Sequence, residues 1–350
     1  SKKLRADDII LFCDQLGVLL NSGVDIIKSL DILALQVTSQ KLYDIILSIK
    51  NQVAGGETLA AAMSKYPKVF PVFMINLVEI GQSSGTLPAV MARIAVYMEK
   101  SEAIKRKIKG ALTYPAVLVG VSIIAIIVFM VKIIPIFQKI FSEFNIKLPE
   151  LTQMVVNISN IVRKYIILEV IIAVGIVFLF KKLLSIYEFR VKFDKIILNI
   201  PILGPLLRKS SIVSFCTSFS VLLANGVSVI DAIDMVKSSL GNLYLAEHFI
   251  KIKNKVKGGI ALSKCLEETE DYPPMVVQMI GVGEETGKLT EMLDKIAEFY
   301  DKRVASALDA LTSVFEPLIL VVMGGIIGVL VISMFLPIFK MSQIGSGGAL

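Results

Sequence analysis

Hydrophobic residues recur every three or four positions through the first part of the chain, with polar residues between them. This spacing is typical of amphipathic α-helices, which bury one face and expose the other. No stretch alternates as a half-buried β-strand would. Glycine-containing turns and the pairs Tyr66-Pro67 and Phe70-Pro71 interrupt the pattern, so we expect about six short helices before residue 110. The apolar positions of the first three are Ile9, Phe12, Leu16, Leu19 and Leu20, then Ile26, Ile27, Leu30, Leu33 and Val37, then Leu42, Ile45, Ile46, Ile49 and Val53.

Three longer apolar runs are candidates for membrane spans. Residues 110–131 and 317–339 contain no charge, and roughly 20 residues suffice for a helix to cross the hydrocarbon. The third run, 170–180, has only eleven residues between Glu169 and Lys181. It spans the membrane only if these two end residues reach the interfaces. Glu169 and Lys132 are the ionisable groups nearest to membrane depth, and we expect both to anchor the ends of their spans.

The chain contains an internal duplication. Phe12-Cys13 returns as Phe215-Cys216, a shift of 203 residues, and after the loss of one residue the shift becomes 202. The repeat includes the spans themselves. The matched positions are Gly23 with Gly226, Gly81-x-x-x-Gly85-x-Leu87 with Gly283-x-x-x-Gly287-x-Leu289, Pro115 with Pro317, and Ile134-Pro135 with Leu336-Pro337.

The duplication constrains the topology. Two copies of one polar module belong on the same side of the membrane, so the chain crosses an even number of times between them and run 170–180 has to span. Basic residues beside the spans place both modules and the N-terminus in the cytoplasm.

We expect an all-α, multi-pass inner-membrane protein with two homologous six-helix cytoplasmic bundles and three transmembrane helices. The predicted parts are module 1 (1–110), two spans joined by a short extracytoplasmic loop (111–184), module 2 (185–315), the third span (316–340) and an extracytoplasmic tail (341–350). The charged N-terminus has no apolar core behind it, so no cleavable signal peptide is expected.

Composition agrees with a membrane protein and excludes several kinds of chemistry. Hydrophobic residues make up 55% of the chain and charged residues 19%, which is more apolar than ordinary soluble domains. His248 is the single histidine, so neither a His-rich zinc site nor a nucleophile-histidine triad is expected. The net charge of +7 is concentrated beside the spans without interleaved aromatic residues, which argues against nucleic-acid binding. We predict no catalytic, cofactor or metal site.

Several local motifs are interpreted as structural. The segment 283–289 resembles a phosphate-binding loop, but Val282 stands where the first glycine is needed and Leu289 where a hydroxyl is needed. We interpret it as a turn between helices. Cys13 and Cys216 are expected at one buried packing position in each copy. We expect His248 on a helix surface and the following acidic residues on solvated faces: Glu267, Glu268, Glu270, Asp271, Glu298 and Asp301. Gly324 and Gly328 form a G-x-x-x-G that permits close packing of a helix, from this chain or a second subunit.

These features resemble the type II secretion system F family, the inner-membrane platform proteins of type II secretion systems, type IV pili and competence pseudopili. The resemblance covers about the whole chain. Its motifs are Leu19-Leu20-x-x-Gly23, the two Gly-x-x-x-Gly-x-Leu segments, Tyr114-Pro115 and Glu316-Pro317, Leu148-Pro149-x-x-Thr152, and Leu198-x-x-Pro201-x-x-Gly204-x-x-x-Arg208. Many members carry an additional segment before the first copy, whereas about eight residues precede Ile9 here, so contacts of that segment are not carried over.

The resemblance implies a platform without chemistry of its own. The cytoplasmic bundles would couple a hexameric ATPase to the insertion or extraction of prepilins or pseudopilins, together with other inner-membrane assembly proteins and as a homo-oligomer in the lipid. Charged module residues expected to contact partners are Arg93, Glu99, Arg106, Glu284, Glu285 and Lys288. The alternative is a small oligomeric transporter or channel, although polar groups within the spans are sparse.

Overall fold

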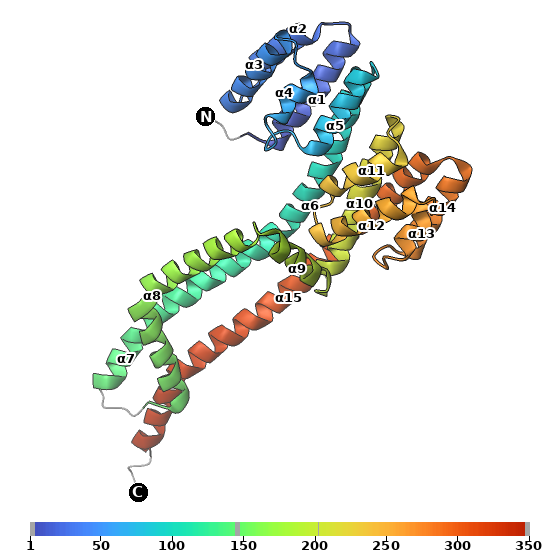
Figure 1. The fold of residues 1–350 in the computed structure, drawn as a ribbon. Helices are drawn as coiled ribbons and strands as arrows, with labels where there is room; N and C mark the ends of the chain where they lie inside the picture. Colours follow the sequence, from blue (N-terminus) through green and yellow to red (C-terminus); the bar gives the residue numbers. More distant parts are fainter. Residues whose placement is uncertain (1–3, 144–147, 202, 347–350) are drawn as a thin grey trace. The chain divides into compact units, whose positions relative to one another are not determined.

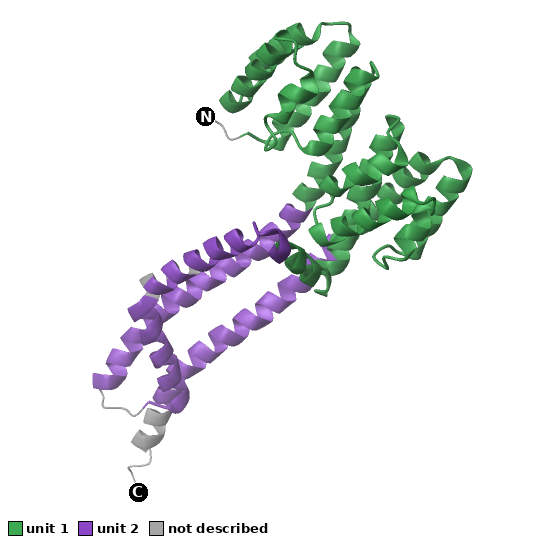
Figure 2. Cartoon of the chain, in the orientation of Figure 1, with its two compact units in different colours: residues 1–107, 190–307 green, residues 108–189, 308–350 purple. Residues whose placement is uncertain are grey.

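The computed structural model describes residues 4–143, 148–201 and 203–346 (Figure 1). Helices dominate these residues, and no strand occurs among them, which confirms the all-α prediction. The chain forms two compact units (Figure 2). Unit 1 comprises Ser1–Lys107 with Arg190–Ala307, and unit 2 comprises Ile108–Phe189 with Leu308–Leu350.

The first copy of the duplicated module, called copy 1, is a six-helix bundle in unit 1. Its core contains the residues that the three-four spacing marked: Phe12, Leu30 and Ile46 are at most 1% exposed. The amphipathic pattern therefore predicted the buried faces correctly. Its helices are α1 (Ala6–Asn21), α2 (Ile26–Gln36), α3 (Gln40–Ala54), α4 (Leu59–Ser64), α5 (Val72–Ser83) and the first part of α6 (Leu87–Val128).

The second copy, copy 2, repeats this arrangement. Cys216 is fully buried at the position equivalent to Cys13, as predicted, and burial raises the pKa of both thiols well above the usual range. These cysteines are core residues. The helices are α9 (Tyr187–Leu198), α10 (Leu203–Ala224), α11 (Val229–Val236), the 3-10 turn η2 (Lys237–Ser239), α12 (Leu243–Lys257), α13 (Leu262–Glu267), α14 (Pro274–Thr286) and the first part of α15 (Leu289–Ser346).

The repeated glycine motif joins two helices in each copy. Gly85 and Gly287 have φ of +72° and +71° at the ends of α5 and α14, a backbone conformation that favours glycine. The earlier glycine of each motif lets the next helix approach. A Cβ atom on Gly283 would lie only 2.9 Å from Cα of Leu289, and one on Gly81 only 3.1 Å from Cα of Leu87. The prediction of a turn between helices is confirmed.

Unit 2 contains the rest of α6, the π-helical turn η1 (Phe129–Ile133), α7 (Ile134–Glu143), α8 (Glu150–Leu183) and the remainder of α15. Its small apolar core consists of Ile134, Val155, Val156 and Leu330. Helix α6 is continuous from Leu87, so one helix carries residues of both units, as the sequence predicted.

Three helices in the described part of the chain are long and apolar enough to cross a membrane: Leu87–Glu143, Leu203–Ala224 and Leu289–Phe339. Their most apolar windows are 6%, 61% and 17% buried, respectively. The middle one is α10, which corresponds to α1 of copy 1 and carries core residues such as Phe215. We therefore assign α10 to the bundle. The predicted second span, 170–180, lies within the 34-residue helix α8, where Ile171 and Phe178 are exposed, and it stays a prediction.

The close approach at Gly283 can be tested by adding one methyl group. We expect Gly283→Ala to destabilise the protein by about 1–3 kcal/mol, because its Cβ would overlap the start of α15. Gly281→Ala is the matched control on the same helix, since its Cβ would meet no atom closer than 3.5 Å. Thermal unfolding of the detergent-solubilised chain checks both variants. Equal Tm values for the two would contradict this packing.

Candidate functional site

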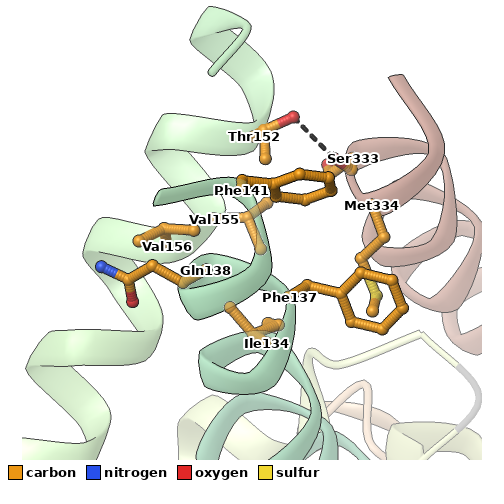
Figure 3. Close-up of a pocket in the computed structure, with 9 residues that line it drawn as sticks. All are labelled: Ile134, Phe137, Gln138, Phe141, Thr152, Val155, Val156, Ser333 and Met334. Carbon is orange, nitrogen blue, oxygen red and sulfur yellow. Dashed lines mark hydrogen bonds between the residues drawn. The ribbon is translucent and has the colours of Figure 1, made fainter. Parts of the chain in front are cut away.

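A hollow in unit 2 lies where α7, α8 and α15 meet (Figure 3). Most of its lining is apolar, and three of the lining residues have polar side chains. The lining residues are Ile134, Phe137, Gln138, Phe141, Thr152, Val155, Val156, Ser333 and Met334. The polar contacts in and beside this hollow show what holds the three helices together.

One hydrogen bond supplies the donor that a proline removes from a helix. Pro337 lies inside α15 and has no backbone N–H, so the carbonyl of Ser333, four residues earlier, lacks its helical donor. The hydroxyl of Thr152 on α8 donates to this carbonyl at 2.5 Å (Figure 3). Thr152 is only 3% exposed. This hydrogen bond therefore satisfies an acceptor that is buried among apolar side chains.

A second contact does the same for the other proline of the duplicated pair. Before Pro135 the helix widens into the π-turn η1, in which the N–H of Ile134 donates to the carbonyl of Phe129, five residues earlier. In that register the carbonyl opposite Pro135 is that of Met130. The hydroxyl of Ser159 on α8 donates to it, and Ser159 is 1% exposed.

Helix α8 thus binds both proline-containing segments. Pro135 and Pro337 are equivalent in the duplication, and Thr152 and Ser159 are seven residues apart, so they share one face of α8. In the sequence, Thr152 was marked only by a family motif, and Ser159 was not predicted to have a role. The signal available in the sequence was that the equivalent Pro135 and Pro337 each remove a helical donor, and that the two Ser or Thr hydroxyls of α8 are two helical turns apart.

The duplicated starts of the first and third spans also meet in unit 2. Tyr114 and Glu316 precede Pro115 and Pro317, and they are equivalent residues in the repeat. The hydroxyl of Tyr114 donates to the carboxylate of Glu316 at 3.3 Å. Equivalent positions of the two copies are therefore joined directly where the spans begin.

The charged residues predicted to contact partners have different surroundings in unit 1. Arg93 donates to the carbonyl of Ala224 at the end of α10. Arg106 forms an ion pair with Asp7 at 2.6 Å. The remaining predicted residues are half-buried Glu284 and exposed Glu99, Glu285 and Lys288.

Glu284 caps a helix inside its own copy. Its carboxylate accepts hydrogen bonds from the backbone N–H groups of Leu262 and Ser263 at 2.7 and 2.9 Å, at the start of α13. Gln82, its equivalent in copy 1, accepts from the N–H of Ala60 at 2.9 Å, at the start of α4. This shared geometry gives Glu284 a structural role that the sequence did not reveal.

The prediction of solvated faces was wrong for Asp271, whose side chain is 8% exposed. Its carboxylate lies 2.6 Å from the guanidinium of Arg208, and Nδ1 of His248 lies 2.9 Å from its other oxygen. His248 is consequently half-buried, packed edge-on against Tyr244, rather than on an open surface. Asp271 lies between Glu270, whose φ is +55°, and the α14 N-cap Pro273.

The other acidic residues match the prediction more closely. Glu267, Glu268, Glu270 and Glu298 are exposed, whereas Asp301 is half-buried and pairs with Lys107 at 3.0 Å. Among the described residues, no three His, Cys, Asp or Glu side chains gather into a possible metal site.

The G-x-x-x-G face of α15 is open within the described chain. A Cβ atom on Gly324 or Gly328 would meet no described atom within 4 Å. Within the part that the structure describes, these glycines therefore do not mediate a helix contact. Packing against a second subunit stays a prediction.

Comparison with known proteins identifies the family. The model of the family described as "Type II secretion system (T2SS), protein F" matches residues 12–135 and, a second time, residues 215–337. The chain belongs to this family. The two matches follow the two copies of the duplication, so the repeat found in the sequence is a repeat of the family's own domain.

Curated relatives extend over nearly the whole chain. The Type IV pilus assembly protein PilC of Myxococcus xanthus is 36% identical over 97% of this chain and 81% of the relative. PilC of Pseudomonas aeruginosa is 36% identical over 98% and 92%, respectively. The Type II secretion system protein F of the same organism is 29% identical over 98% and 85%. The family therefore includes proteins of both pilus assembly and secretion.

The Thr152 contact predicts a stability difference between two conservative variants. Thr152→Val keeps the shape of the side chain but leaves the Ser333 carbonyl without its donor, which costs about 1–3 kcal/mol. Thr152→Ser keeps the hydroxyl and serves as the control. Heat denaturation in detergent should give a lower Tm for the valine variant. A valine variant as stable as the serine variant would show that the hydrogen bond contributes little.

Proposed function

We propose that the chain is an inner-membrane platform of a type IV pilus or type II secretion machine. In this role it couples a cytoplasmic hexameric ATPase to the movement of pilin or pseudopilin subunits. The observation that carries the proposal is the continuity of α6 and α15, each of which contains residues of a polar bundle and of an apolar span. Family membership and the names of the relatives agree with it.

The proposed topology places both bundles in the cytoplasm and gives α8 the second crossing. The parity of the duplication and the basic residues next to the spans support this orientation. A bundle on that side is accessible to an ATPase, and the spans are accessible to subunits within the membrane. Coupling then requires only that the bundles and spans move together.

For the ATPase contact we propose the exposed charges on either side of the α14 C-terminus, Glu285 and Lys288. Reversing both, with Glu285→Lys and Lys288→Glu, should weaken binding of the solubilised full chain to its ATPase at least about tenfold, because interface charges act by complementarity. Glu267→Lys, at an exposed position elsewhere on copy 2, is the control. Wild-type affinity in the double variant would exclude this surface, and a folded wild-type chain that does not bind or stimulate the ATPase would contradict the proposed coupling.

Continuity of α6 can be tested separately from binding. Inserting Gly-Gly after Ala103 adds two poor helix formers and rotates the following residues by about 200°. We expect pilus assembly or secretion to be abolished, while membrane insertion and ATPase binding persist. The control is the same insertion after Gly56, in the exposed turn between α3 and α4. Normal assembly with the Ala103 insertion would sink the idea that α6 transmits motion.

A further inference from the structure

Within unit 1, the two copies contact each other through different faces. Helix α5 of copy 1 packs against α11 and η2 of copy 2 (Figure 1). On α6, Arg93 donates to the carbonyl of Ala224 at the end of α10. The hydroxyl of Tyr97 lies near the side chains of Ser218 and Ser239, which oppose the rise in its pKa that burial causes. Copy 1 therefore contributes its last two helices, and copy 2 contributes the equivalents of the first two.

Such a contact is heterologous, because it joins different faces of two similar domains. The first two helices of copy 1 and the equivalents of the last two in copy 2 therefore remain outside this contact. In copy 2 the equivalents of Arg93 and Tyr97 are Lys295 and Phe299 on α15. In copy 1 the equivalents of Ser218, Ala224 and Ser239 are Gln15, Asn21 and Gln36 on α1 and α2. The chemistry is retained, with a cation and an aromatic ring on one face and a helix C-terminus on the other.

Exposure differs between the used and unused faces. Thr217 and Ser218 of α10 are 8% and 0% exposed, whereas the equivalent Asp14 is exposed and Gln15 half-buried. Exposed apolar side chains surround the open face of copy 1: Leu11 (54%), Val18 (59%) and Leu35 (83%). On the open face of copy 2, Phe299 is 39% and Val282 50% exposed.

We propose that two copies of this chain associate head to tail through these open faces. Helices α14 and α15 of one chain dock on α1 and α2 of the next, in the relation that joins copy 1 to copy 2 within one chain. Lys295 reaches the C-terminal carbonyls of α1, where a cation is favoured, and Phe299 packs beside Gln15 and Gln36. Val18 and Leu35 supply apolar area next to this ring. The contact does not depend on the proposed function.

Paired cysteines test the docking directly. The native cysteines Cys13, Cys216 and Cys265 are free and buried, so we do not expect them to form cross-links. Full-length Gln15→Cys and Phe299→Cys chains are purified separately, mixed in lipid nanodiscs or detergent, and oxidised. We expect a disulfide-linked dimer in the mixture and not in either variant alone. Tyr97→Cys with Ser218→Cys in one chain reports the internal contact, and Lys257→Cys mixed with Gln15→Cys is the control at an exposed position away from the face.

The outcomes separate the possible occupants of the face. A dimer formed by Gln15→Cys alone would indicate a symmetric contact and overturn the head-to-tail proposal. No dimer in the mixture, with the internal pair formed, would also overturn it. So would a Gln15→Cys chain that cross-links to added ATPase instead of a second copy, because the face would then belong to that partner. Adding Val18→Asp should lower the cross-linked fraction at least about tenfold, whereas Ile250→Asp, similarly exposed on α12, should not.

Discussion

A backbone carbonyl that loses its helical donor to proline needs another donor when it lies in a membrane, because water does not reach it there. At Pro135 and Pro337, unit 2 meets this requirement with one helix. Thr152 and Ser159 of α8 donate to the carbonyls of Ser333 and Met130, next to the equivalent prolines. The two sites are not identical, since the π-turn before Pro135 moves the free acceptor by one residue. Because α8 carries both donors, it lies between segments that the duplication made alike, and the apolar core around Ile134 and Leu330 forms at the same place.

The bundles show how one fold keeps its geometry while individual residues change. In copy 1, Thr58 caps α4 with its own hydroxyl, and Gln82 adds one further acceptor. In copy 2 the N-cap position holds Ala261, which has no side-chain acceptor. Glu284 replaces the glutamine, and its two carboxylate oxygens accept both N–H groups at the start of α13. Two N–H groups at the start of the short helix thus have side-chain acceptors in each copy. The residues differ at both positions, but Gln82 and Glu284 both accept from the N–H of equivalent residues, Ala60 and Ser263.

The sequence predicted features that depend on nearby residues, and it did not predict contacts between residues far apart in the chain. Helix spacing, the turn at Gly283 and the buried cysteines follow from short-range patterns, and a repeat found twice strengthens each of them. Contacts such as that of Thr152 with Ser333 join residues 181 positions apart, so the spacing of hydrophobic residues does not predict them. The burial of Asp271 depends on Arg208, 63 residues away. Length and composition alone make α10 a candidate span, whereas 61% of its most apolar window is buried. Arg93 and Glu284, which were predicted to contact partners, bind backbone groups of their own chain, and their contact with partners stays a prediction.

The hydroxyl contacts of α8 also bear on how a platform in the membrane could move. Helix α15 cannot slide along α8 without breaking the Thr152 bond, and the segment before Pro135 cannot do so without breaking that of Ser159. Each break would leave a buried acceptor unsatisfied, at a cost of about 1–3 kcal/mol. Because α8 makes both hydrogen bonds, a displacement of one proline-containing segment is transmitted to the other until one of these bonds breaks. Beyond it, the hydroxyls release and the prolines become the places where the helices bend, because their backbone hydrogen bonds are already missing. If the chain has the proposed function, these residues would hold the spans together under a small load and permit a discrete rearrangement under a larger one.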